Sequence, residues 1–226
     1  MRHKDRLKGI KIVYEDRDIL VIDKPPGLLT MGTDTDKENT AYSILTDYVR
    51  KGYSKSRNRI FIVHRLDRDT SGLLIFAKSE QAKFSLQDQW DKAQKKYLAI
   101  VYGIIPDKSG TITSYLAENS ARMVYSTSNK SIGKLSTTIY NVLKENKGLS
   151  LLEIDLVTGR KNQIRVHLAE KGYPIVGDKK FGREYDSHKR MALHSYSISF
   201  KHPFSGRQLK FETSFPEYFS GLIGSL

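Results

Sequence analysis

The chain of 226 residues contains no cysteine, which excludes disulfide frameworks, thiolate nucleophiles and zinc sites built on cysteine. It also has no apolar run that approaches the roughly 20 residues needed to cross a bilayer. Because 38% of its residues are hydrophobic, the chain can bury a sizeable core. These features favour a soluble, folded protein that forms a single domain over residues 1–226.

Acidic residues are outnumbered, since 25 Asp and Glu stand against 38 Lys and Arg and the net charge is +13. Such an excess indicates a nucleic-acid partner. An anionic lipid surface is the competing explanation, but no basic amphipathic helix supports it. Between residues 50 and 68 the single acid is Asp67, and we expect the surrounding charge to gather phosphates near it. The basic residues of that stretch are Arg50, Lys51, Lys55, Arg57, Arg59, Arg65 and Arg68.

The N-terminus lacks the apolar segment of a secretory signal, so cytoplasmic residence is expected. Residues 1–9 are interpreted as a basic tail. A solvated chain end explains this tail as well as an arm that contacts nucleic acid.

Strand-like runs outnumber helical patterns along the chain. Residues 10–14 and 19–22 flank a polar turn and predict a β-hairpin, which Pro25 and Pro26 end because neither can donate to a sheet ladder. Helical spacing predicts helices at residues 41–51, at residues 79–92 with Ser79 as N-cap, and at residues 161–171. Further strands are predicted at residues 60–63, 73–77, 96–102, 111–115, 122–126, 136–143, 149–157, 192–201 and 208–213.

Because strands dominate without strand–helix alternation, the predicted class is α+β. We expect a mostly antiparallel, mixed β-sheet core flanked by helices and loops. No linker divides the chain, although residues 103–108 or 146–148 could separate two lobes of one continuous sheet.

Familiar cofactor signatures are missing, namely a P-loop, a glycine fingerprint before a helix, a His-Glu-x-x-His motif and a nucleophile elbow. Chemistry driven by nucleotide or zinc is therefore not expected. What stands out instead is Asp67, in a basic neighbourhood between a β-rich run and a turn. From composition alone, an Asp in such a loop is more often a turn or capping residue.

The motif around Asp67 changes that interpretation. His64-Arg65-Leu66-Asp67-Arg68-Asp69-Thr70-Ser71-Gly72-Leu73 resembles the H-R-L-D-x-x-T-S-G-L signature of RluA-type pseudouridine synthases. Further segments resemble motifs of the same family in the same order, and the likeness extends from about Tyr14 to Pro216. One departure is Lys161-Asn162, where many relatives carry Thr-His, and we interpret it as a subgroup variant. The further segments are residues 23–28, 96–99, 152–154, 158–167, 172–178 and 193–194.

The resemblance implies the pseudouridine synthase fold and the isomerisation of specific uridines in structured RNA, either ribosomal or transfer RNA. This reaction detaches uracil from the sugar, turns the base and joins the sugar to carbon 5. It involves no redox change and no group donor, so no cofactor or metal is expected. In the family the motif Asp is catalytic, which assigns that role to Asp67. The carboxylate could attack covalently or abstract a sugar proton, and the residues leave both routes open.

The resemblance also assigns partners to Asp67. Arg165 becomes its ion-pair partner, although composition alone favours a solvated helix charge. Tyr97 becomes a ring packed against the target uracil, with a hydroxyl that is a candidate for helping to remove the carbon 5 proton. Without the resemblance, Tyr97 would be interpreted as a core aromatic of a strand.

Five residues are candidates for the RNA-facing surface. Arg65 lies two residues before Asp67, so in an extended segment both project to one side, and its guanidinium could fill the place of a flipped uridine. Phosphate pairing is an equal alternative for Arg65. His64 is expected to be a structural hydrogen-bonder rather than a proton shuttle. Lys24, Arg160 and Lys161 are candidate phosphate contacts, each with plain surface charge as the alternative.

Two other classes of function compete with this interpretation. A non-catalytic RNA-binding protein would explain the basic stretch but not Asp67, since an acid there weakens phosphate binding. A metal-dependent nuclease needs several converging carboxylates, and Asp67 with Asp69 makes a poor site. The first catalytic motif begins near residue 23, so we expect no separate N-terminal RNA-binding domain, and we expect a monomer.

Overall fold

The computed structural model describes residues 7–32, 38–53 and 55–225, so most of the expected basic tail lies outside the described residues. The chain forms two compact units. The first combines Met1–Ala93 with Ser197–Thr213, and the second combines Gln94–Tyr196 with Ser214–Leu226. Residues 103–108 and 146–148, the two segments that could have separated lobes, both lie inside the second unit.

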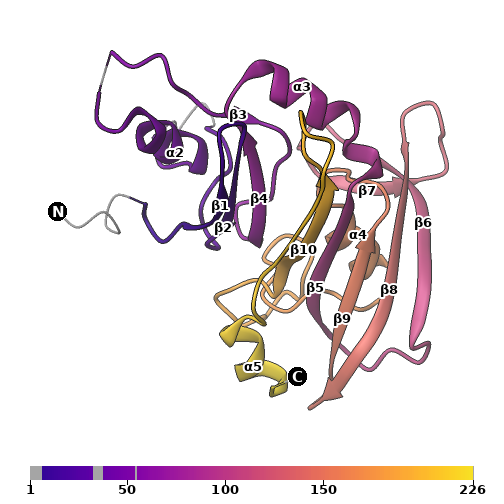
Figure 1. The fold of residues 1–226 in the computed structure, drawn as a ribbon. Coiled ribbons are helices and arrows are strands. Elements are labelled where there is room, and N and C mark those ends of the chain that lie inside the picture. The colour runs from indigo at the N-terminus through magenta and orange to yellow at the C-terminus, as the bar shows by residue number, and fades with distance from the viewer. Residues whose placement is uncertain (1–6, 33–37, 54, 226) are drawn as a thin grey trace. The chain divides into compact units, whose positions relative to one another are not determined.

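The first unit is built on a β-hairpin followed by a buried strand (Figure 1). The predicted hairpin is confirmed, and Asp16 closes its turn by accepting hydrogen bonds from the backbone N–H groups of Asp18 and Ile19, both at 2.8 Å. The strands of this unit pair antiparallel as β1 with β2, β2 with β4, β3 with β4, and β11 with the part of β10 from Ser197 on, while β10 before Ser197 belongs to the second unit. Their bounds are Lys11–Glu15 for β1, Ile19–Lys24 for β2, Phe61–Ile62 for β3, Ser71–Ala77 for β4, Leu193–Lys201 for β10 and Gln208–Glu212 for β11.

Two helices of the first unit begin at side-chain caps. Helix α2 spans Ala41–Arg50, and helix α3 spans Glu80–Asp88 with the predicted cap, since Ser79 Oγ accepts from Ala82 N at 3.1 Å. Helix α3 ends earlier than expected and is followed by the 3-10 turn η1, Trp90–Lys92. The unit's core packs β2 and β4 against α3, through residues that include Ile19, Val21, Leu73, Ile75, Ala82 and Leu86.

The second unit contains five antiparallel strands in the order β5-β9-β8-β6-β7 (Figure 1). Helix α4, Gln163–Glu170, packs against β6, β7 and β8. A helix that the sequence did not predict, α5 at Glu217–Ile223, packs against β8 and β9 and buries Phe219 and Ile223. The strand bounds are Gln94–Tyr102 for β5, Ser109–Glu118 for β6, Val124–Thr127 for β7, Lys134–Asn146 for β8 and Leu149–Leu156 for β9.

The α+β class is confirmed, because helices and antiparallel strands occur together in both units. The eight strand pairings given above for the two units are antiparallel, and an isolated parallel bridge joins Leu29 to Thr40. Among the described residues, no helix has both the length and the apolarity to cross a membrane.

Candidate active site

Asp67 lies half-buried on a turn immediately before β4, where Thr70 N donates to Asp67 O at 3.3 Å. The backbone on its N-terminal side is held by Thr30, a buried residue whose hydroxyl donates to Leu66 O at 2.9 Å and accepts from Leu66 N at 3.2 Å. On the other side, Gly27 N donates to Arg68 O at 2.9 Å. The carboxylate therefore projects from a backbone that is fixed on both sides.

Lys24 contributes to the same arrangement from inside the protein. Its side chain is fully buried, and its ammonium donates to the carbonyl oxygens of Pro25, Leu28 and Arg68 at 3.0, 2.7 and 3.0 Å. Burial lowers the pKa of Lys24 to about 8, against the opposing effect of Asp69, Asp67 and Asp23. The expected phosphate contact is therefore wrong, because all three N–H groups point at carbonyls of the turns around Asp67.

His64 extends the pairing of β3 with β4. After Phe61 and Ile62 pair with Ala77 and Phe76, His64 Nε2 accepts from Ile75 N at 3.1 Å, so a ring nitrogen takes the place of a strand carbonyl. The ring also stacks on Trp90, with centroids 4.4 Å apart. These contacts hold the His64 ring between a strand N–H and an aromatic ring.

The basic stretch before β4 does not gather as a whole around Asp67. Arg65 is exposed near Asp67, with Nη1 at 3.4 Å from Met31 Sδ, and Arg68 pairs with Asp69 at 3.1 Å. The strand register instead puts Arg59 beyond the opposite end of β4, since Phe61 pairs with Ala77. The expectation of one charge cluster around Asp67 is wrong, because the extended segment between residues 61 and 67 separates the cations.

In the second unit, Arg165 on α4 forms a bidentate ion pair with Asp178. Arg165 Nε donates to Asp178 Oδ2 at 2.8 Å and Nη2 donates to Oδ1 at 2.7 Å, while the two residues are 8% and 1% exposed. Burial alone would raise the pKa of Asp178, but Arg165 and the N–H groups of Lys180 and Phe181 hold the pKa below its usual value. The guanidinium also lies 5.1 Å from the centroid of the Phe181 ring.

Asp178 is a residue to which sequence reasoning assigned no role. The available signal was its position in the segment of residues 172–178, directly after Gly177. That glycine has φ +77°, and a Cβ there would lie 2.0 Å from Arg190 O. The backbone is thus fixed where Asp178 begins, and the carboxylate fixes the plane of Arg165.

The start of α4 is anchored by Gln163. Its Oε1 accepts from Thr158 Oγ1 at 2.8 Å and from Arg160 N at 3.0 Å, and its Nε2 donates to Thr137 O at 3.0 Å. The loop before the helix is therefore tied to β8, and the exposed side chain of Arg160 lies on it. Lys161 is also exposed and forms an ion pair with Glu118.

Tyr97 is a buried residue of β5, paired in register with Ile154 of β9 and 7% exposed. The adjacent Lys96 forms an ion pair with Glu153 at 2.8 Å.

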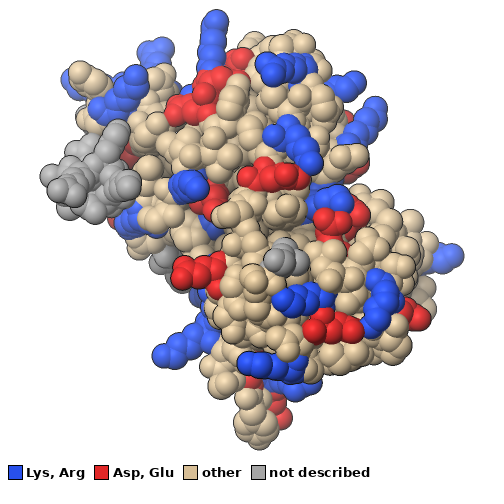
Figure 2. Space-filling view, turned by 60° about the horizontal axis from the view of Figure 1, so that its bottom comes forward, with Lys and Arg blue, Asp and Glu red and all other residues tan. Residues whose placement is uncertain are grey.

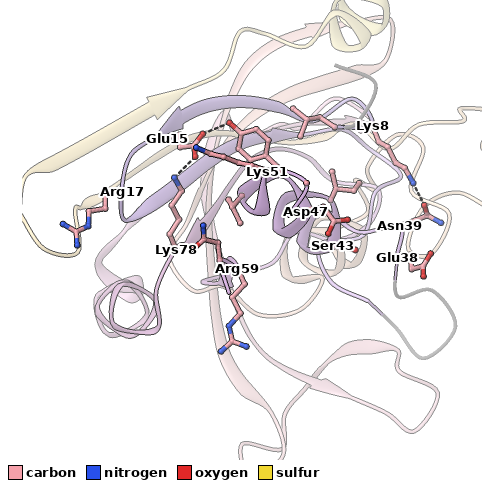
Figure 3. A pocket seen from close by; sticks show the side chains of 16 residues that line it. Lys8, Glu15, Arg17, Glu38, Asn39, Ser43, Asp47, Lys51, Arg59 and Lys78 are labelled. Carbon is pink, nitrogen blue, oxygen red and sulfur yellow. Dashed lines mark hydrogen bonds and ion pairs between the residues drawn. The ribbon is translucent and has the colours of Figure 1, made fainter. Parts of the chain in front are cut away.

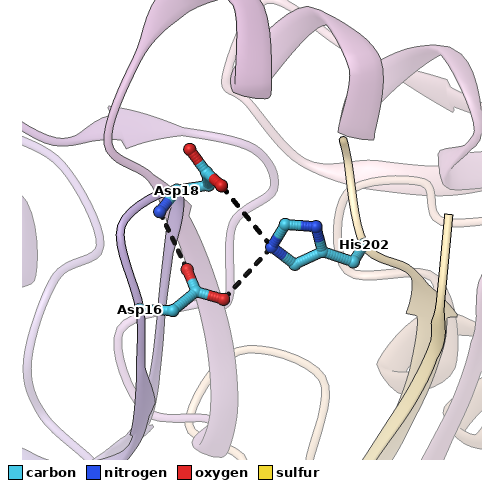
Figure 4. Close-up of side chains that lie close together, drawn as sticks. All are labelled: Asp16, Asp18 and His202. Atoms are coloured by element: carbon cyan, nitrogen blue, oxygen red, sulfur yellow. Dashed lines mark hydrogen bonds and ion pairs between the residues drawn. The ribbon is translucent and has the colours of Figure 1, made fainter. Parts of the chain in front are cut away.

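Asp16, Asp18 and His202 form a cluster in the first unit that could be mistaken for a metal site (Figure 4). His202 Nδ1 accepts from the backbone N–H groups of Phe204 and Ser205 at 3.3 and 3.2 Å. The ring proton therefore belongs on Nε2, which lies 3.1 Å from Asp16 Oδ2. A metal at Nε2 would have to displace this proton while Nδ1 accepts from two backbone N–H groups, so the cluster is best explained as a hydrogen-bonded link between two turns.

A cavity of about 1220 Å³ lies in the first unit beside α2 (Figure 3). Its lining includes the basic residues Lys8, Arg17 and Lys51 but also the acids Glu15 and Asp47, so the charge is mixed. None of the predicted site residues lines it. On the face shown in Figure 2, basic and acidic side chains are likewise interspersed.

Comparison with known proteins agrees with the motif around Asp67. A model of the RNA pseudouridylate synthase family matches residues 18–170. The uncharacterized RNA pseudouridine synthase YlyB of Bacillus subtilis is 34% identical over 230 residues, covering 96% of this chain and 73% of that protein. The ribosomal large subunit pseudouridine synthase D of Pseudomonas aeruginosa is 34% identical over 233 residues, covering 96% and 72%. The structure of human RNA pseudouridylate synthase domain containing 1 is similar with a TM-score of 0.76 at 26% identity, covering 93% of this chain and 85% of that one.

Proposed function

The chain belongs to the RNA pseudouridine synthase family, and from that premise we propose that Asp67 is the catalytic carboxylate of its uridine isomerisation. The observation that carries this proposal is the support of the Asp67 turn. Thr30 holds the residue before it, while Lys24 and Gly27 hold the residue after it. A catalytic group needs such a fixed backbone, because small displacements of a reacting atom are costly to the rate.

We propose that Arg165 binds the Asp67 carboxylate and keeps it ionised. A guanidinium has five N–H donors, and the bidentate pair with Asp178 occupies two of them, so Arg165 can bind two carboxylates at once. Asp178 would then act as a positioning residue that sets the plane in which Arg165 presents its other donors. The family resemblance supports this pairing of Arg165 with Asp67.

The reaction needs no external reactant in this scheme. The bond between the anomeric carbon and the uracil nitrogen breaks, the anomeric carbon bonds to carbon 5, and the proton lost from carbon 5 is balanced by one gained at the nitrogen. Asp67 serves this sequence either as a covalent nucleophile or as a base at the sugar. Tyr97 is proposed to pack against the uracil ring, and its hydroxyl to assist removal of the carbon 5 proton.

The RNA target belongs to the proposal as well. Large-subunit ribosomal RNA is the first substrate to test, because the relative from Pseudomonas aeruginosa is named for that RNA, and transfer RNA is the second. Arg65 is proposed as the group that fills the place of the flipped uridine, and Arg160 and Lys161 as phosphate contacts. A monomeric state, cytoplasmic residence and independence of cofactors stay predictions.

One assay tests the function and its competitors together. Purified protein is incubated, without added metal or nucleotide, with unmodified transcripts of ribosomal and transfer RNA. Pseudouridine is then mapped by carbodiimide marking and primer extension. We expect new stops with the wild-type protein and none with Asp67→Asn, which should still bind the transcripts. Strand scission would favour a nuclease, and binding without either product would favour a non-catalytic RNA-binding protein.

A further inference from the structure

An exposed loop with an unusual composition connects α2 to β3. We call this segment the basic loop, and we count as its members the side chains that carry positive charge or an aromatic ring. Tyr53 is 74% exposed there, although an aromatic ring of its size is usually at least half covered. The members of the basic loop are Lys51, Tyr53, Lys55, Arg57 and Arg59.

The basic loop lies far from Asp67 within the first unit. Because Phe61 pairs with Ala77, Arg59 lies beyond the C-terminal end of β4, whereas the Asp67 turn leads into its N-terminal end at Ser71. A strand of seven residues at about 3.3 Å per residue separates the two by roughly 20 Å. Arg59, where the basic loop enters β3, therefore lies too far from Asp67 to contact the nucleotide that reacts there.

The backbone of the loop is held by its own hydrogen bonds. Tyr53 N donates to Arg50 O at 3.0 Å, and Ser56 N donates to Tyr53 O at 3.0 Å. Arg50 Nε closes the loop by donating to Asn58 O at 3.3 Å. This organisation lowers the conformational entropy that a ligand would have to overcome on binding.

The cations of the loop are not consumed by internal ion pairs. No carboxylate among the described residues lies within ion-pairing distance of Lys55 or Arg57. Arg59 makes a long contact of 3.9 Å with Glu80, and its guanidinium lies 4.8 Å from the centroid of the Phe61 ring. Figure 3 shows the Arg59 side chain extending away from α2 and from Asp47. Three positive charges are thus presented on the same loop as the exposed ring of Tyr53.

We propose that the basic loop is a second RNA-contacting surface, which binds backbone phosphates and one unstacked base of the substrate away from the reacting uridine. The proposal rests on the proposed function, since it assumes an RNA substrate. Uncompensated cations fit phosphates, and an exposed ring beside them fits a base, which is the combination that single-stranded RNA requires. The loop supplies affinity for RNA and takes no part in the chemistry.

Salt-dependent binding tests the charges. The probe is a fluorescein-labelled, 20-nucleotide single-stranded RNA of mixed sequence, titrated with protein between 50 and 200 mM salt. For Lys55→Gln/Arg57→Gln/Arg59→Gln, the slope of log Kobs against log salt should become shallower by about 2, since each lost phosphate contact removes about 0.7. A matched variant, Lys130→Gln/Lys134→Gln/Lys171→Gln, removes three exposed cations of the second unit and should change the slope by less than half as much.

The ring is tested separately from the charges. Tyr53→Ala should weaken binding of the same RNA by about 5-fold or more, because stacking on one base contributes about 1–3 kcal/mol and 1.4 kcal/mol is tenfold. Tyr53→Phe keeps the ring and should bind like the wild type. Thermal unfolding of each variant shows whether a loss of binding reflects a loss of fold.

Three outcomes would overturn the inference. The first is that folded variants of the basic loop bind RNA as well as the matched control does. The second is that both triple variants change the salt slope equally, because such a change would reflect net charge alone. Unchanged RNA binding with lost binding to vesicles of anionic phospholipid would assign the loop to a membrane instead. Failure of the proposed function can be distinguished from failure of this inference. In that case the wild-type protein would make no pseudouridine, although its affinity for RNA would still depend on the basic loop.

Discussion

Replacement of Asp178 by asparagine tests the support of Arg165 directly. The substitution preserves size and shape but removes the charge that two N–H groups of Arg165 contact at 2.8 and 2.7 Å. It also turns one acceptor oxygen into an NH₂ donor, which would face a guanidinium that only donates. Both side chains are nearly fully buried, so water cannot replace the lost acceptor.

The expected loss of stability is large. Removal of one partner from a buried, hydrogen-bonded ion pair costs about 3–5 kcal/mol, because the remaining charge stays buried without compensation. Whole domains are stable by only about 5–15 kcal/mol, so the variant should unfold at a clearly lower urea concentration. Displacement of Arg165 should also lower kcat/KM for pseudouridine formation by about 100-fold, as misplacement of a positioning group does.

The assay combines urea unfolding with activity and pH. The matched control is Asp107→Asn, which neutralises an exposed carboxylate of the same unit and should leave both readouts near the wild type. Because the pKa of Asp178 is lowered in the folded protein, its contribution is present above about pH 4 and is lost as the pH falls through the folded pKa. The stability difference between wild type and Asp178→Asn should therefore shrink in acid. An unchanged urea midpoint at neutral pH, or a difference that grows in acid, would refute the reasoning.

Three further predictions concern the supports of the two units. Lys24→Met should remove the donor from three partly buried carbonyls and lower the free energy of unfolding by at least about 2 kcal/mol. It should also reduce pseudouridine formation, which Thr46→Val, a substitution at another buried residue, should not do. His64→Ala should lower the free energy of unfolding by about 1–3 kcal/mol, because Ile75 N–H loses its acceptor, and unchanged urea unfolding would contradict the structural role. Gly177→Ala should lower the melting temperature by several degrees, because the residue has φ +77° and its new Cβ would collide with Arg190 O. The control is Gly172→Ala, which has a similar φ of +85° but open space around the Cβ, so it measures the cost of the backbone conformation alone.

The strands and helices that could be predicted from sequence are those with strong local signals. The hairpin before Lys24 combines two apolar runs with a turn that Asp16 closes, and Ser79 is followed by residues with helical spacing. Both signals lie within a few residues, so no long-range contact was needed to recognise them. Helix α5 was missed because it is short and contains Ser220 and Gly221, which are poor helix formers. Its stability comes from the burial of Phe219 and Ile223 by strands far away in sequence.

The supports of the candidate site were beyond sequence reasoning for a related reason. Lysine is almost never fully buried, so composition argues for a surface role at Lys24. The actual role depends on Arg68, 44 residues away, whose carbonyl completes the cage around the ammonium. Asp178 is likewise 13 residues from Arg165 and separated from it by a turn. Motifs single out residues such as Asp67 and Arg165, whereas the groups that fix them are chosen by the fold: a buried lysine at the Asp67 turn in the first unit, and a buried aspartate at Arg165 in the second.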